Sequence, residues 1–205
     1  MGVDTSGSEP QSNPENNMAK IESLMTPLGT QAPAFSLYDT VSDQIVTLVS
    51  NQKFMATVIL FICNHCPYVK HINPELARLS ADYSQKGVRF IAINSNDVEA
   101  YPDDSPENMK RIAKEHHYNF PYLFDETQEV AKAYQATCTP DFFVYNNELN
   151  LVYRGQLDDS RPGNMKPLNG SSIRTALDCL LANTANLSQQ KPSIGCNIKW
   201  KHTVP

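Results

Sequence analysis

Residues 55–69 read MATVILFICNHCPYV, and this stretch decides the fold. Residues 55–62 are continuously apolar and rich in branched side chains, which is typical of a central strand buried on both faces. Two cysteines three residues apart, Cys63 and Cys66, follow this strand directly. The stretch therefore predicts a strand-to-helix junction that carries a C-x-x-C motif.

Beyond the cysteine pair, apolar residues recur at helical spacing and predict a helix that runs to about residue 85. Pro74 falls inside this helix and is expected to kink it. The next apolar stretch, residues 88–94 (VRFIAIN), predicts a second strand. Strand, helix and strand in this order make a right-handed βαβ unit, so the two strands are expected to be parallel.

The other predicted elements add strands and helices to this unit. They are a short hairpin that ends at 46–49, helices over 106–116, 125–134 and 171–183, and an antiparallel hairpin of 141–145 and 149–154. The fold class is therefore α/β, a central mixed sheet with helices on both faces, an N-terminal hairpin and a C-terminal extension.

The domain organisation follows from composition. We expect one domain over 25–186, preceded by a disordered tail or expression remnant over 1–24 and followed by an extension over 187–205. The first 17 residues are polar and lack the features of a secretory signal, and no apolar run is long enough to span a bilayer. We therefore expect a cytoplasmic protein with no membrane partner.

Composition narrows the chemistry further. With 40% apolar residues, 19% charged residues and a net charge of −5, the chain is typical of a globular protein and offers no basic surface to nucleic acid. The five cysteines are an odd number, which argues against a framework of structural disulfides. In a reducing compartment, a close cysteine pair indicates catalysis or metal binding.

The position of the cysteine pair favours redox chemistry. Cysteines three apart at a helix start lie one turn from each other and can close a small disulfide ring. The free N–H groups and the dipole of the helix stabilise a thiolate there. We expect Cys63 to be the outer thiol with a lowered pKa, and Cys66 to be less exposed. A protonated His65 would favour the Cys63 thiolate further.

Other interpretations of the pair are an inert core pair, half of a zinc site, or a copper(I) carrier. A structural zinc site needs a second Cys/His pair at similar spacing, and none follows. The copper(I) alternative would use Cys63, Cys66 and His71. Dithiol redox chemistry with no resident metal is the interpretation we favour.

A second signal is Thr139-Pro140, just before a predicted strand. A cis-proline there would turn the Thr139 backbone toward the cysteine pair and leave its N–H and C=O free for an extended substrate strand. A trans proline at the first residue of a strand is the alternative, and the sequence does not separate the two.

Four motifs resemble a known family: residues 29–37 (GTQAPAFSL), 61–69 (FICNHCPYV), 138–142 (CTPDF) and 195–201 (GCNIKWK). They are similar to redoxin domains of the alkyl hydroperoxide reductase/thiol-specific antioxidant (AhpC/TSA) type, which have a thioredoxin-like fold, and to an uncharacterised bacterial branch with a CNHCP motif. The resemblance implies Cys63 as the attacking thiol, Cys66 as the resolving thiol and Pro140 as the cis-proline. The strand before Cys63 lacks both the Pro-x-x-x-Thr-x-x-Cys pattern of peroxiredoxins and the buried acid of thioredoxins.

These observations predict a thiol–disulfide oxidoreductase in which Cys63 attacks a disulfide, with His65 and Thr139 at the substrate. Its partners would be a protein or small-molecule disulfide and a reducing thiol protein, and it would need no cofactor. A thiol peroxidase, an antioxidant enzyme using the same thiol, is the alternative within enzymes.

Two further cysteines are candidates for accessory redox thiols. Cys138 lies two residues before Pro140, and Cys196 lies in the extension. The extension is expected to fold back over the site, where Cys196 would pair with Cys138.

Overall fold

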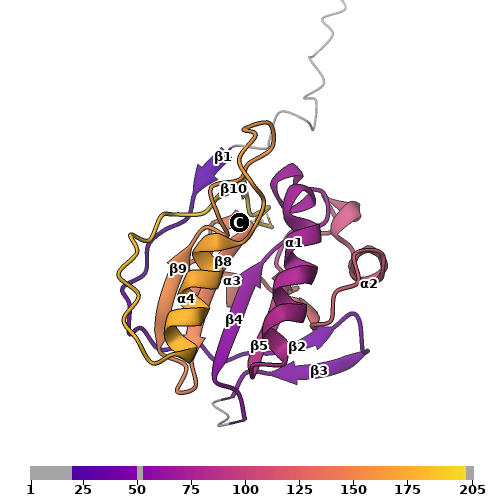
Figure 1. Ribbon diagram of the computed structural model, residues 1–205. Helices are drawn as coiled ribbons and strands as arrows, with labels where there is room; N and C mark the ends of the chain where they lie inside the picture. The colour runs from indigo at the N-terminus through magenta and orange to yellow at the C-terminus, as the bar shows by residue number, and fades with distance from the viewer. Residues whose placement is uncertain (1–19, 50–52, 202–205) are drawn as a thin grey trace, which may run out of the picture.

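The computed structural model describes residues 20–49 and 53–201, and its centre is a seven-stranded mixed sheet (Figure 1). The strand order is β3-β2-β6-β5-β4-β8-β9. The strands are β2 (Ser36–Asp39), β3 (Gln44–Thr47), β4 (Ala56–Phe61), β5 (Val88–Asn94), β6 (Tyr122–Phe124), β8 (Asp141–Asn146) and β9 (Leu151–Gly155). β4 pairs parallel with β5 and antiparallel with β8. The predicted βαβ unit and mixed sheet are confirmed.

Helices cover both faces of this sheet, as the apolar character of β4 predicts. They are α1 (Pro67–Ser84), α2 (Pro106–Glu115), α3 (Glu129–Tyr134) and α4 (Ser171–Leu181), with the short 3₁₀ helix η2 (Pro102–Asp104) before α2. Val58 and Leu60 pack in the core cluster that holds residues of α1, α2 and α4. Ile59 and Phe61 pack in a second cluster, which holds residues of α3. Successive side chains of β4 therefore point to opposite faces of the sheet and pack against the helices on each face.

A second, three-stranded sheet has the order β1-β10-β7. Its strands are β1 (Lys20–Glu22), β7 (Cys138–Thr139) and β10 (Ile194–Asn197). The sequence placed the start of the domain at residue 25, yet Lys20–Glu22 already pair with β10. The rest of the predicted tail, residues 1–19, lies outside the described residues. The extension over 187–205 contributes β10, which lies beside the amino end of α1 (Figure 1).

None of the described helices is both long and apolar enough to cross a membrane.

Candidate active site at the amino end of helix α1

The cysteine pair lies where β4 passes into α1. Cys66 is the N-cap residue of α1, and Pro67 occupies the first helical position. Proline suits that position because its missing N–H would have no partner in the helix. The Cys63 and Cys66 side chains are both buried, with 1% and 0% of their surface exposed. The expectation that Cys63 is an outer, exposed thiol is therefore wrong for this structure.

Cys63 lies in surroundings that disfavour its thiolate. Burial raises its pKa most, a hydrogen bond with Cys66 adds to the shift, and the negative charge of Asp104 raises the pKa further. A hydrogen bond with the Thr139 hydroxyl, whose oxygen lies 3.2 Å from the sulfur, acts in the opposite direction. The predicted lowering of the Cys63 pKa is wrong, because burial and a neighbouring carboxylate outweigh the helix N-terminus.

Cys66 has the lower pKa of the pair. Its thiol donates a hydrogen bond to the Thr139 carbonyl oxygen (3.2 Å), and its sulfur lies 2.9 Å from the Cys196 sulfur. Hydrogen bonds from the Cys196 and Cys63 thiols lower the pKa of Cys66, and the backbone N–H of Val69 in the first turn of α1 lowers it as well. The helix end thus stabilises negative charge on the second cysteine rather than the first.

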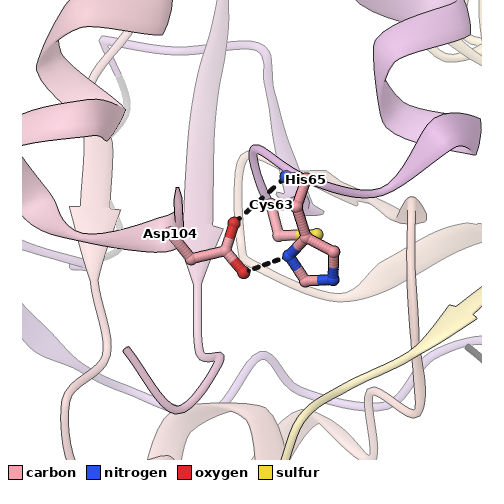
Figure 2. Close-up of side chains that lie close together, drawn as sticks. All are labelled: Cys63, His65 and Asp104. Carbon is pink, nitrogen blue, oxygen red and sulfur yellow. Dashed lines mark hydrogen bonds and ion pairs between the residues drawn. The ribbon is translucent and has the colours of Figure 1, made fainter. Parts of the chain in front are cut away.

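A buried carboxylate, Asp104 on η2, holds the turn between the two cysteines (Figure 2). Its Oδ1 accepts hydrogen bonds from the backbone N–H groups of Asn64 (2.7 Å) and His65 (3.2 Å). Its Oδ2 accepts one from Asn96 Nδ2 (2.7 Å) and lies 2.6 Å from His65 Nδ1. The carboxylate therefore has two partners on each oxygen, which satisfies it in a buried position.

His65 does not act as an unpaired positive charge beside Cys63, as the sequence suggested. Its Nδ1 lies 2.6 Å from Asp104 Oδ2, so the ring is engaged with this carboxylate. The ring stacks on Tyr101 at a centroid distance of 5.3 Å. Its Nε2 has no hydrogen-bond partner among the described residues.

No sequence pattern pointed to Asp104 as a site residue. Residues 101–105 read as a polar loop before a helix, and acidic residues in such loops are usually solvated. The sequence did not predict Asn96 and Tyr101 as site residues either, because only the tertiary structure brings them close to the turn at 63–66.

The Thr139–Pro140 peptide bond is cis, the geometry that the resemblance implies. The Thr139 backbone edge, however, is already occupied, because β10 pairs antiparallel with β7 and places Cys196 opposite Thr139. The expectation of a free edge for a substrate strand is therefore wrong in this structure. The chain's own C-terminal segment lies where that strand was expected.

The remaining candidates lie in different places. The Cys196 sulfur lies 2.9 Å from that of Cys66, and all of these thiols are free, so the expected Cys138–Cys196 pairing stays a prediction. The Cys138 sulfur is directed at the Pro140 carbonyl oxygen (3.7 Å), and burial raises its thiol pKa. His71 hydrogen-bonds the hydroxyl of Ser160 through Nε2 (2.8 Å).

The copper(I) set of Cys63, Cys66 and His71 is not assembled in this structure. The donor atoms that do lie together, within 4.8 Å of one another, belong to Cys63, His65 and Asp104. Both Asp104 oxygens are already hydrogen-bonded to the turn. The carboxylate is thus engaged in holding backbone and side-chain N–H groups, which does not favour metal ligation.

Fold and site together define a thioredoxin-like protein with a C-x-x-C pair facing a cis-proline. A putative thiol:disulfide interchange protein DsbE from Chlorobium tepidum shares this fold, with a TM-score of 0.60 at 16% identity over 77% of this chain and 99% of that one. The AhpC/TSA family model matches residues 28–154, more than half of the chain. The protein belongs to the AhpC/TSA family.

Much more similar structures are known. An uncharacterized conserved protein from Geobacillus kaustophilus is 59% identical, with a TM-score of 0.88 over 91% of this chain and 99% of that one. A hypothetical protein from Sinorhizobium meliloti 1021 is 44% identical, with a TM-score of 0.86 over 89% and 99%. Neither name states an activity.

Among curated proteins, the chain is similar to the thiol-disulfide oxidoreductase ResA. It is 27% identical to that of Bacillus subtilis and 25% identical to that of Halalkalibacterium halodurans, each over 60% of this chain. The match spans 64% and 65% of these relatives, slightly under two thirds of their length. Both relatives are named as thiol-disulfide oxidoreductases.

Proposed function

We propose that the protein is a thiol–disulfide oxidoreductase that cycles between a Cys63–Cys66 dithiol and a Cys63–Cys66 disulfide. The observation that carries the proposal is that both cysteines of the pair, at the start of α1, contact Thr139 next to a cis-proline: Cys63 Sγ lies 3.2 Å from the Thr139 hydroxyl oxygen and Cys66 Sγ lies 3.2 Å from the Thr139 carbonyl oxygen. Two cysteines three apart at a helix start lie one turn from each other, which is the spacing at which a disulfide ring can close. The relationship to ResA supports the same chemistry.

Cys63 attacks in this proposal, and Cys66 first serves as its proton acceptor. The pKa of Cys63 is raised and that of Cys66 is lowered, so Cys66 is the thiol of the pair that loses its proton more easily and can then accept the proton of Cys63. Transfer of the Cys63 proton to the Cys66 thiolate gives a Cys63 thiolate and a Cys66 thiol. The Cys63 thiolate then attacks one sulfur of a substrate disulfide, and the other substrate sulfur leaves as a thiolate.

The second half of the cycle closes the disulfide. The Cys66 thiol loses its proton to the departing substrate thiolate and attacks the Cys63 sulfur of the mixed disulfide. The Cys63–substrate bond breaks, and the second substrate sulfur leaves as a thiolate. Two electrons have passed from the protein dithiol to the substrate, and a reducing thiol protein returns them.

His65 and Thr139 are the substrate-side residues in this proposal. His65 Nε2 is the ring nitrogen left for a substrate, since Nδ1 is paired with Asp104. The Thr139 hydroxyl contacts the Cys63 sulfur and lowers its pKa, which assists ionisation of the attacking thiol. Pro140 shapes the segment that carries Thr139. Because Cys63 is buried, a substrate reaches it only after a local opening of the surrounding segments.

The proposed substrates are protein or small-molecule disulfides, and we propose a cytoplasmic location. No dissociable organic cofactor is required, since the cysteine pair itself carries the electrons.

Reduction of insulin disulfides by dithiothreitol tests the proposal. We expect the wild type to accelerate the reaction, and Cys63→Ser and Cys66→Ser to return the rate to that of dithiothreitol alone. Cys179→Ser, a cysteine on α4 outside the site, is the matched control and should retain the wild-type rate. An unaccelerated wild-type reaction would contradict the proposal. If the protein does not reduce insulin but consumes hydrogen peroxide rapidly, and this activity depends on Cys63, the thiol peroxidase alternative would replace the proposed function.

A further inference from the structure

A third thiol lies against the cysteine pair. Cys196, on β10, is 3% exposed, and its sulfur lies 2.9 Å from that of Cys66. The two residues are 130 positions apart in the chain. The tertiary structure therefore creates this contact, and the C-x-x-C motif alone does not predict it.

The position of Cys196 is fixed on both sides of β10. Its strand pairs with β7 along one edge and with β1 along the other. After the strand, the Lys199 backbone N–H donates to Asn96 Oδ1 (2.9 Å), and Gln128 Nε2 donates to the Lys199 carbonyl (2.8 Å). The C-terminal segment is thus held as part of the fold.

Gly195 allows β10 to approach the site closely. A Cβ at this position would overlap the Thr139 carbonyl oxygen and lie 3.1 Å from the Pro140 ring. Only a residue without a side chain fits there, so the sequence Gly195-Cys196 places a thiol next to Cys66 at the cis-proline. Cys138, by comparison, is directed at the Pro140 carbonyl.

We propose that Cys196 is a third redox-active thiol, and that Cys66 exchanges its disulfide bond from Cys63 to Cys196. The inference rests on the proposed function in one respect, the formation of the Cys63–Cys66 disulfide. Cys196 loses its proton and attacks the Cys66 sulfur, forming the Cys66–Cys196 bond. The Cys63–Cys66 bond breaks, and Cys63 leaves as a thiolate that takes up the proton.

This step is an exchange without net oxidation, because one disulfide replaces another. It returns Cys63 to the thiol form while the protein keeps one oxidising equivalent. The two disulfides exclude each other, since both need Cys66. The product also fastens the C-terminal strand to α1, which keeps β10 on the Thr139 edge. The oxidised protein would therefore carry a closed site, in which a covalent bond adds to the strand pairing that already holds β10 on this edge.

Peptide mapping under oxidising conditions tests the exchange. Trypsin leaves Cys63 and Cys66 together in the peptide 54–70, and Cys138 in 133–154. The Lys191-Pro192 bond resists trypsin, so Cys179 and Cys196 share the peptide 175–199. All variants therefore also carry Cys179→Ser, so that a disulfide to this peptide can only involve Cys196. The protein is oxidised with oxidised glutathione, and the remaining free thiols are then alkylated at acid pH.

In the double variant Cys63→Ser, Cys179→Ser, we expect most of the protein to contain peptide 54–70 linked to peptide 175–199. In Cys179→Ser alone, the same linked species should appear beside the internal Cys63–Cys66 disulfide. The matched variant Cys196→Ala, Cys179→Ser should keep the internal disulfide and lose the link. A link from peptide 175–199 to the Cys138 peptide, or Cys196 alkylated in full while Cys66 carries glutathione, would overturn the proposal.

Failure of this inference can be told apart from failure of the proposed function. If the protein reduces insulin and forms the Cys63–Cys66 disulfide while Cys196 stays alkylatable, only the third thiol is refuted. If the internal disulfide does not form and insulin is not reduced, the proposed function fails. The link in the Cys63→Ser variant would then still establish a Cys66–Cys196 pair.

Discussion

The two sides of the cysteine pair show how differently one motif can be surrounded. On the Cys63 side, η2 supplies the Asp104 carboxylate, which holds the turn and opposes a second negative charge. On the Cys66 side, β7 and β10 supply the Thr139 carbonyl and the Cys196 thiol. The pKa of Cys63 is raised and that of Cys66 is lowered. Burial and partners from distant segments therefore decide which sulfur ionises first.

We expect the largest effect when one sulfur of the pair is removed at a time, by Cys63→Ser or by Cys66→Ser. The lowered Cys66 pKa means that its thiolate persists as pH falls below the ordinary thiol range. We expect ultraviolet thiolate absorbance of the reduced protein at neutral pH, with complete loss of that signal in Cys66→Ser. Cys63→Ser should keep it, because a hydroxyl remains to donate to Cys66. The reverse pattern would assign the thiolate to Cys63.

Removal of the Asp104 charge tests the Cys63 side. Asp104→Asn places an NH₂ group or a weaker acceptor against donors from Asn64, His65 and Asn96. Because a buried, paired charge is lost, we expect a destabilisation of about 3–5 kcal/mol. Urea unfolding measures the change.

Asp103→Asn is the control for this prediction, since Asp103 lies beside Asp104 on η2 and is exposed. Its free energy of unfolding should stay within about 0.5 kcal/mol of the wild type. Equal effects of the two substitutions would show that the carboxylate network does not hold the turn.

Displacement of β10 tests the Cys66 side. In Gly195→Ala the added methyl group overlaps the Thr139 carbonyl oxygen, so the strand must shift away from β7. We expect a loss of about 1–3 kcal/mol of stability from this overpacking. Because the shift moves the Cys196 donor away, the Cys66 pKa should rise toward its ordinary range, which the same absorbance titration follows. If the titration of Cys66 does not change, the position of β10 has no influence on the Cys66 pKa.

The smallest expected effect concerns the contact that joins the two sides. Thr139→Val keeps the shape of the side chain and removes the hydroxyl that contacts the Cys63 sulfur. The Cys63 pKa should rise further, because this hydrogen bond lowers it. Stability should fall by about 0.5–1.5 kcal/mol, the net value of one hydrogen bond. Rates of Cys63 alkylation against pH measure the first effect, and a faster rate at low pH would contradict it.

Local sequence patterns predicted the frame of the protein. The apolar run at 55–62 predicted a buried central strand, and the spacing of Ile72, Leu76 and Leu79 predicted the helix that packs on it. The C-x-x-C motif placed two sulfurs one turn apart at the helix start. These features depend on neighbours within a few residues along the chain, and periodicity records such neighbours directly.

Only the tertiary structure decided the chemistry of the two sulfurs. Asp104, Thr139 and Cys196 come from three separate segments, and no periodicity relates them to the motif. A thiol pKa depends on desolvation and on charges within a few ångströms, which are set by which segments the fold brings together. The sequence by itself determined that a cysteine pair stands at a helix end. The folded chain determined that burial and distant partners shift the pKa values of the two cysteines in opposite directions, and that a third thiol lies 2.9 Å from the second cysteine.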